Sequence, residues 1–299
     1  MQLRVLGSAA GGGFPQWNCG CANCSGLRAG TLRARARSQE SLAVSADREH
    51  WLLLNASPEI RGQNESYTPL WPREKRHSPV SGVLLTNGDL DHCLGLLSLR
   101  ESQPIAVYAT AAVRRGFTEG NALYRTLERF PGQVRWHELA LGREVELDGG
   151  LSLTALPVPG KLPIHLERSS APSPEDNVAL RLREAGSGRT LAYLPAVAGA
   201  SPAVSAAVEG ADCIFFDGTF WSSDELVAAG LGARRAEEMA HWPVGGAQGS
   251  LGFLAKLPGR RVLIHLNNTN PLLREDGPEA AAARAAGVEI AFDGMELRL

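Results

Sequence analysis

The sequence predicts a layered α/β protein built from large mixed β-sheets. Its 299 residues, 44% of them hydrophobic, are enough for a large buried core. Short apolar runs alternate with amphipathic stretches at irregular intervals, and no fixed-period repeat stands out. Some apolar runs follow one another at hairpin distance, whereas others are separated by helix-like segments. This mixture indicates sheets that contain both antiparallel and parallel strands.

Each element follows from its local pattern. Strands are expected where short apolar runs are bounded by turn residues, and helices where the pattern is amphipathic. The last helix ends before Gly287, a typical helix stop. The expected strands are residues 3–6, 42–45, 51–54, 80–85, 105–108, 134–137, 151–155, 178–183, 190–193, 213–216, 262–265 and 289–292. The expected helices are residues 94–101, 111–127, 202–208, 223–229, 235–240, 250–256 and 278–286.

The composition excludes several classes of partner. The formal net charge is −2, and a near-neutral protein is a poor partner for nucleic acid, because phosphate binding needs a basic surface. No apolar stretch approaches the roughly 20 residues that span a bilayer. Residues 1–7 have the pattern of a strand and not of a secretory leader. We therefore expect a cytoplasmic protein with reduced thiols, no membrane span and no nucleic-acid partner. The glycine-rich segment 7–13 fits neither a P-loop nor a dinucleotide fingerprint.

Three of the five cysteines lie close together, as Cys19, Cys21 and Cys24. Thiolates at this Cys-x-Cys-x-x-Cys spacing can occupy three corners of a tetrahedron, which predicts a structural zinc site. The fourth ligand must come from elsewhere in the chain. The alternative is a set of unliganded or redox-active thiols. Cys93 and Cys213 have apolar neighbours and are expected to be core residues.

A second candidate metal site lies in residues 86–92, which read Thr-Asn-Gly-Asp-Leu-Asp-His and follow an apolar run. Asp89, Asp91 and His92 thus stand where a buried strand ends, and strand ends at a sheet edge are where α/β folds place their chemistry. Carboxylates with an imidazole suit Fe(II) or Mn(II) at least as well as zinc. The alternative is an ordinary Asn-Gly-Asp turn with a solvated histidine.

Two later strand ends carry the same kinds of residue. Asp217 follows the apolar run 213–216, and His265 ends the run 262–265. Either residue alone is more often structural, as a turn carboxylate or a buried histidine. Strand ends converge at one sheet edge, however, and two histidines with carboxylates are the ligands of non-haem Fe(II) oxygenases. His241, beside Trp242, is a candidate proton donor or acceptor; the alternative is a histidine that simply packs on the indole ring.

Together these residues resemble the metallo-β-lactamase superfamily, whose mark is a His-x-His-x-Asp-His loop after a strand. In this chain Asn87 and Asp89 stand at the first two histidine positions, whereas Asp91 and His92 keep theirs. The altered loop therefore places an ordinary two-zinc hydrolytic centre in doubt.

The resemblance continues along the chain. Asp217 matches the bridging aspartate of the superfamily, and His265 matches its final histidine. The middle histidine normally follows a Pro-Gly pair, where this chain has Lys161, within a proline-rich loop at residues 157–174. The resemblance implies a single metal ion, with Lys161 in the space or charge of the second.

A closer resemblance is to one branch, the pyrroloquinoline quinone (PQQ) biosynthesis protein B family. It is carried by residues 1–19, 54–61, 86–92 and 265–271, including the altered metal loop. The implied fold is a four-layer αββα sandwich, one domain over residues 1–299 with a cysteine-rich zinc loop at 17–25. In a related phosphodiesterase a histidine completes a similar cysteine site, and Asn268 stands at the matching position here. Asn268 is a poor zinc ligand, so the fourth ligand stays open.

The resemblance implies a role in PQQ biosynthesis. In the first hypothesis the protein is an Fe(II)-dependent hydroxylase with O₂ as co-substrate. It acts on the tyrosine ring of a precursor that derives from a glutamate–tyrosine peptide unit. Asp91, His92 and His265 would hold iron, Asp217 or Asp89 would complete the set, and His241 would handle protons. The alternative is a non-catalytic carrier of PQQ or its precursor toward the periplasm. A metal hydrolase is a weaker third possibility, because histidines are lost. Other proteins of the pathway are possible partners.

Overall fold

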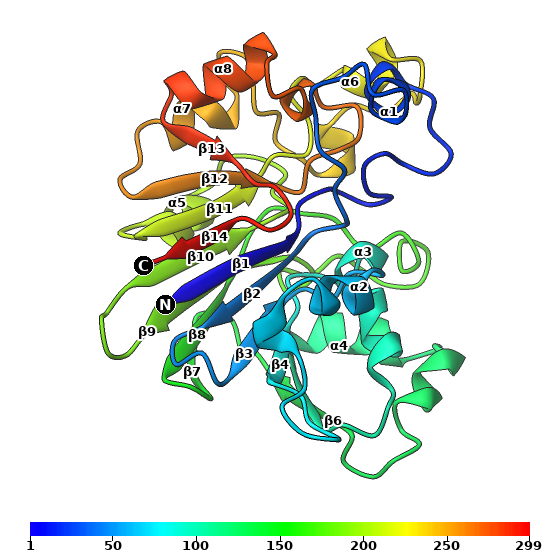
Figure 1. The fold of residues 1–299 in the computed structure, drawn as a ribbon, viewed down its shortest axis with the longest axis vertical. Helices are drawn as coiled ribbons and strands as arrows, with labels where there is room; N and C mark the ends of the chain where they lie inside the picture. Colours follow the sequence, from blue (N-terminus) through cyan, green and yellow to red (C-terminus); the bar gives the residue numbers. More distant parts are fainter.

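The computed structural model describes all residues 1–299 and shows two seven-stranded mixed sheets lying face to face (Figure 1). In each sheet, antiparallel pairing on one side changes to parallel pairing on the other. The first sheet has the order β14 (Glu296–Arg298), β1 (Gln2–Gly7), β2 (Ser41–Ser45), β3 (Trp51–Leu54), β4 (Val80–Leu84), β5 (Ile105–Ala109), β6 (Val134–Glu138). The second has the order β13 (Val288–Ile290), β12 (Arg260–Ile264), β11 (Cys213–Asp217), β10 (Thr190–Leu194), β9 (Val178–Glu184), β8 (Leu151–Pro157), β7 (Glu144–Leu147).

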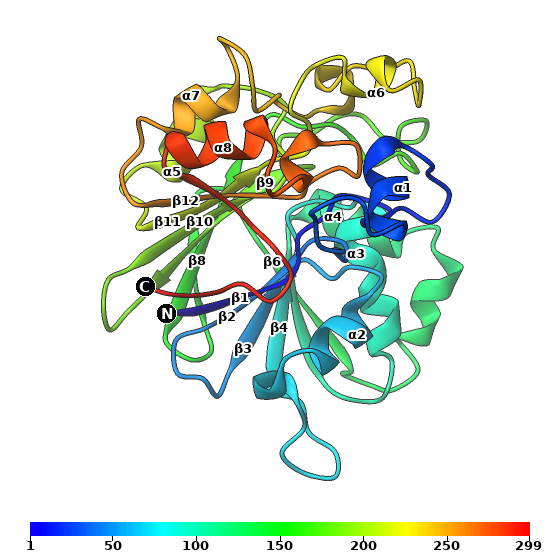
Figure 2. The same ribbon diagram turned by 45° about the horizontal axis from the view of Figure 1, so that its top comes forward.

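Helices cover the outer face of each sheet, which gives the αββα order of layers (Figures 1 and 2). The α-helices are α1 (Ala22–Arg28), α2 (Ile60–Glu65), α3 (Leu90–Cys93), α4 (Ala111–Thr118), α5 (Pro202–Val208), α6 (Glu225–Ala228), α7 (Ser250–Leu254) and α8 (Pro278–Ala285). Short 3₁₀ helices are η1 (Thr68–Leu70), η2 (Leu94–Leu99), η3 (Ala122–Thr126), η4 (Glu237–Met239) and η5 (Pro271–Leu273). None of these helices combines the length and apolar character that crossing a membrane requires.

Three apolar clusters hold the layers together. The largest, 27 buried residues, fills the space between the sheets and includes Leu54 of β3 and Phe215 of β11. A second cluster joins the outer face of the second sheet to α5, α7 and α8, and also takes in Cys24. The third joins the first sheet to α2, α3 and α4, for example through Phe117. The four-layer sandwich predicted from the sequence is confirmed.

Differences from the expected elements lie mainly at their boundaries. The single helix expected at 111–127 is divided: α4 ends at Thr118, and Gly120 then takes a positive φ of 70° before η3 begins. The helix expected at 94–101 is instead the short α3 followed by η2. The edge strands β7 and β14, and the helices α1 and α2, were not expected, because their short segments have weak periodicity.

The ends of four strands meet at one edge of the sandwich. β3 and β4 in the first sheet, and β11 and β12 in the second, all run toward this edge, and α3 begins just beyond it. The chain termini lie side by side at the opposite end, where the Met1 amino group donates to the Leu299 carbonyl (Figure 1). The edge near α3 is therefore the place where polar residues from both sheets come together.

Gly95 fixes the packing of η2, which continues α3, against the loop after β3. A Cβ atom at Gly95 would lie 2.1 Å from the Ser57 carbonyl oxygen and 2.8 Å from that of Ala56. We expect Gly95→Ala to lower the free energy of unfolding by about 1–3 kcal/mol, because backbone cannot move aside cheaply. The control is Gly62→Ala, since a Cβ atom there meets nothing within 4 Å. It should be neutral or stabilise by about 0.5–1 kcal/mol. Urea unfolding of both variants measures the difference, and equal midpoints would contradict the expected clash.

Candidate metal centre

The first group of metal-type ligands is Asp91, His92 and His265. Asp91 and His92 lie on α3, directly after the loop that ends β4, and His265 follows β12 of the other sheet. Oδ2 of Asp91 lies 3.2 Å from Nε2 of His265 and 3.7 Å from Nε2 of His92. Both imidazoles are buried, and each of the three residues offers a ligand atom within 4.8 Å of the others. Three ligand atoms this close together can hold one divalent cation.

A second group shares His265 and adds Asp217 and His241. Both oxygens of Asp217 are already engaged. Oδ1 accepts from the backbone N–H and the hydroxyl of Thr219, and Oδ2 accepts from the Val197 N–H and contacts Nδ1 of His241 at 2.8 Å. Asp217 thus orients His241, whose ring stacks on that of His265 at a centroid distance of 5.4 Å.

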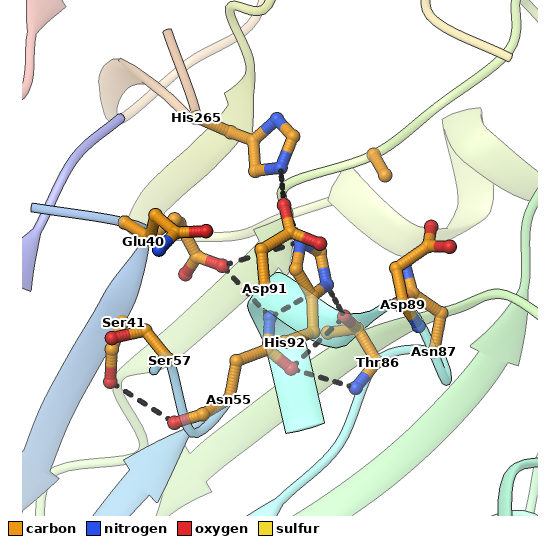
Figure 3. Close-up of polar contacts among 12 residues, drawn as sticks. Glu40, Ser41, Asn55, Ser57, Thr86, Asn87, Asp89, Asp91, His92 and His265 are labelled. Carbon is orange, nitrogen blue, oxygen red and sulfur yellow. Dashed lines mark hydrogen bonds and ion pairs between the residues drawn. The ribbon is translucent and has the colours of Figure 1, made fainter. Parts of the chain in front are cut away.

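Hydroxyl groups fix which nitrogen of each histidine faces the centre. The Thr219 hydroxyl donates its hydrogen to Asp217, so it can only accept from Nδ1 of His265, 2.8 Å away. At His92, the Thr86 hydroxyl lies 3.0 Å and the Asn55 amide nitrogen 3.1 Å from Nδ1 (Figure 3). In both histidines Nδ1 is thus held by neighbouring polar groups, and Nε2 is the atom that faces the centre, which is how hydrogen bonds commonly orient metal ligands.

The charges at the centre suit a cation. Burial alone raises the pKa of the Asp91 carboxyl, but His92 and His265 outweigh it and hold that pKa well below its usual range. Burial lowers the pKa of His92 to about 4, so this imidazole is neutral at physiological pH. Burial also acts against the charge on His265, yet the hydrogen bond and charge of Asp91 raise its pKa to about 9. The ionised carboxylate of Asp91 thus attracts positive charge to the centre.

The structure does not bring Asp89 into either group. Its backbone N–H donates to Oδ1 of Asn87, whose amide in turn donates to Asn177 at 3.2 Å. Burial and the charge of Asp91 raise the pKa of Asp89 to about 6, against the opposing charge of Lys161. Asp89 and Lys161 therefore lie beside the centre, and a cavity of about 410 Å³ next to them is lined by Lys161 and Asn177.

Two residues of the centre were missed from the sequence. Asn55 follows β3, has a left-handed backbone with φ of 62°, and places its amide nitrogen 3.1 Å from Nδ1 of His92. It ends an apolar strand, the same signal that indicated Asp217. Glu40 directly precedes β2, is fully buried, and has a pKa that burial raises to about 8. No sequence signal marked it, because it stands before a strand and not after one.

The three clustered cysteines form a separate site near α1. The sulfur atoms of Cys19, Cys21 and Cys24 all lie within 4.8 Å of one another. The side-chain amide of Asn268 contacts all three, with Nδ2 at 3.1, 3.6 and 3.4 Å from their respective sulfur atoms. Burial raises the pKa of the Cys24 thiol to about 11. Asn268 thus lies where a fourth ligand of a tetrahedral site would be, and Cys93 and Cys213 are buried elsewhere.

Comparisons with known proteins agree with this architecture. Residues 50–266 match the beta-lactamase superfamily domain, so the fold and the histidine–carboxylate groups define a protein of the metallo-β-lactamase type. The chain belongs to the coenzyme PQQ synthesis protein B family. It is 44% identical over 302 residues to the coenzyme PQQ synthesis protein B of Azotobacter vinelandii and 45% identical over 305 residues to that of an Azoarcus species, and each match covers both whole chains.

Solved structures give the same result. The crystal structure of zinc-bound PqqB from Methylobacterium extorquens superposes with a TM-score of 0.94 at 44% identity, over the full length of both chains. A diphosphatase of the PhnP family superposes with a TM-score of 0.68 at 21% identity, covering 100% of this chain and 97% of the other. The second likeness shows the fold alone. The resemblance stated from the sequence is confirmed, and metal binding is supported by the zinc-bound relative and by the two groups of ligands.

Proposed function

We propose that this chain acts in PQQ biosynthesis as an Fe(II)- and O₂-dependent hydroxylase of the tyrosine ring of a glutamate–tyrosine-derived precursor. The observation that carries the proposal is the buried group of Asp91, His92 and His265. Two imidazoles and one carboxylate are the ligand set of non-haem Fe(II) oxygenases, which leave coordination positions for oxygen and substrate.

The loop that follows β4 supports an oxygenase over a two-metal hydrolase. Asn87, at the first histidine position of the superfamily pattern, is occupied by hydrogen bonds to Asn177 and to the Asp89 backbone. Its amide group therefore stabilises the turn and does not face a second metal ion. Fe(II) held by the group would supply the activation of O₂. Hydroxylation places one oxygen atom in the ring and reduces the other to water, so it also consumes two electrons from an external reductant.

The chain's own residues would bind the substrate and move its proton. His241 is held through Nδ1 by Asp217, which leaves Nε2 free to exchange a proton with a phenol. Lys161, which lines the neighbouring cavity, would provide a positive charge for a carboxylate of a glutamate-derived substrate. The free state of all five cysteines supports a place in the reducing cytoplasm.

The test is anaerobic reconstitution with Fe(II), followed by measurement of oxygen consumption with a glutamate–tyrosine dipeptide and a reductant. We expect oxygen uptake that depends on both iron and dipeptide, and a product heavier by one oxygen atom that carries the label from ¹⁸O₂. Tight PQQ binding that survives metal removal, without any oxygen uptake, would instead favour a carrier.

The cysteine group is proposed to bind a structural zinc ion; the amide of Asn268 lies beside the three sulfur atoms, and the fourth ligand stays open. Three sulfur atoms in one partly buried cluster suit zinc, whereas the histidine–carboxylate group suits iron. We expect Cys24→Ser to lose one equivalent of zinc per chain after reconstitution with excess zinc and dialysis, and to be less stable. Cys213→Ala, in the core strand β11, should keep the full amount. Unchanged zinc content in the Cys24 variant would contradict the assignment.

A further inference from the structure

Glu40 is the buried residue of the centre whose presence nothing so far explains. Its side chain is completely excluded from solvent. Oε2 accepts a hydrogen bond from the amide of Asn55 at 2.9 Å, but Oε1 has no hydrogen-bond partner (Figure 3). A buried carboxyl group with an unpartnered oxygen lacks the hydrogen bonds or the charged partner that buried polar groups normally have. No lysine or arginine forms an ion pair with Glu40; its nearest basic group is His92.

Glu40 faces the same nitrogen as the metal ligand Asp91. Nε2 of His92 lies 3.8 Å from Oε2 of Glu40 and 3.7 Å from Oδ2 of Asp91, so two carboxylates approach it at nearly equal distance. Ligand atoms lie about 2.0–2.2 Å from ions of this kind, and two ligands of one ion are therefore separated by roughly 3–4 Å. Both distances fall in that range.

We propose that Glu40 is a fourth protein ligand of the active-site metal ion, together with Asp91, His92 and His265. Glu40 does not belong to the group whose ligand atoms are all within 4.8 Å of one another, so its carboxylate closes on the ion when the ion binds. Oε2, the oxygen 3.8 Å from Nε2 of His92, accepts one hydrogen bond from Asn55 and keeps a lone pair for the ion, and Oε1 has no competing partner. Two carboxylates and two neutral imidazoles balance the charge of a divalent ion and still leave positions open on a six-coordinate centre.

Asn55 has a positioning role in this arrangement. Its amide nitrogen holds Glu40, and its amide oxygen accepts from the backbone and hydroxyl of Thr86, the residue beside His92. One side chain thus links the carboxylate that precedes β2 to the histidine that follows β4. The inference concerns the metal site and is independent of whether the reaction is a hydroxylation.

The test is titration with Co(II), whose visible spectrum reports the number and kind of its ligands. Protein whose cysteine site is filled with zinc is titrated, and any cobalt bound by thiolates is recognised by its ultraviolet charge-transfer band. We expect Glu40→Gln to bind Co(II) about 10- to 100-fold more weakly and with an altered visible spectrum. Glu59→Gln is the control, because Glu59 makes similar hydrogen bonds to Gln39 and Ser57 outside the centre.

Two results would overturn the assignment. Wild-type affinity and spectrum in Glu40→Gln would exclude any role in metal binding. Weaker binding with an unchanged spectrum would make Glu40 a positioning residue and not a ligand. Circular dichroism of the metal-free protein checks folding, and Glu40→Asp, which keeps the carboxylate, should retain a Co(II) spectrum closer to the wild type. Because no turnover is measured, failure of the hydroxylase assay leaves this result unaffected.

Discussion

Asp91→Ala is expected to weaken Fe(II) binding at the active site at least about 100-fold, or about 2.8 kcal/mol, and to abolish turnover. Asp91 is the one residue that contacts both ligand histidines, at 3.2 Å from His265 and 3.7 Å from His92. Its removal takes away a negative charge and leaves two buried imidazoles without the carboxylate between them. Calorimetric titration with Fe(II) under anaerobic conditions measures the loss.

Asp212→Ala is the matched control for Asp91→Ala. Asp212 forms a surface ion pair with Arg189, and its variant should bind iron as the wild type does. Zinc at the cysteine site should be unchanged in both variants, which separates loss of one site from general unfolding. An Asp91→Ala protein that still holds iron and turns over would exclude Asp91 as a ligand.

Phe215→Ala is expected to lower the free energy of unfolding by about 3–5 kcal/mol. Phe215 lies on β11 in the core between the sheets and is completely buried beside the ring of Tyr193. Loss of its ring leaves a cavity that two rigid sheets cannot close. Urea unfolding monitored by circular dichroism in the presence of excess zinc measures the change.

For the neighbouring residue, the substitution Tyr193→Phe is not expected to lower the free energy of unfolding. The Tyr193 hydroxyl is buried and has no hydrogen-bond partner. Its removal should leave stability unchanged or raise it by about 1 kcal/mol, because an unsatisfied buried polar group is lost. A large loss of stability in Tyr193→Phe would show that the hydroxyl has a partner in solution, for example an ordered water molecule.

The residues at strand ends were predictable because their signal is simple. Asp91, His92, Asp217 and His265 each follow a continuous apolar run, and parallel strands of an α/β sheet deliver such residues to one edge. The sequence alone could not show which of these carboxylates is free to bind a metal ion. Only the structure shows that both oxygens of Asp217 are engaged by hydrogen bonds.

Other features depend on contacts between distant segments and leave no local signal. Glu40 reaches the centre from the beginning of β2, through an amide that follows β3. The left-handed backbone of His265, with φ of 62°, likewise has no local sequence signal, because positive φ is uncommon for residues other than glycine. Helix 111–127 was expected to be continuous, yet Gly120 within that range adopts a positive φ.

The origin of the ligands in both sheets has a mechanical consequence. Asp91 and His92 are carried by the half of the molecule that contains β4, and His265 by the half that contains β12. An ion held by all three therefore adds a further link between two halves that are already joined by apolar packing and by hydrogen bonds such as that between Asn87 and Asn177. The ion would have to be released before the halves could separate, so the free energy of unfolding would depend on the metal supply. Removal of the metal ion is therefore expected to lower the free energy of unfolding.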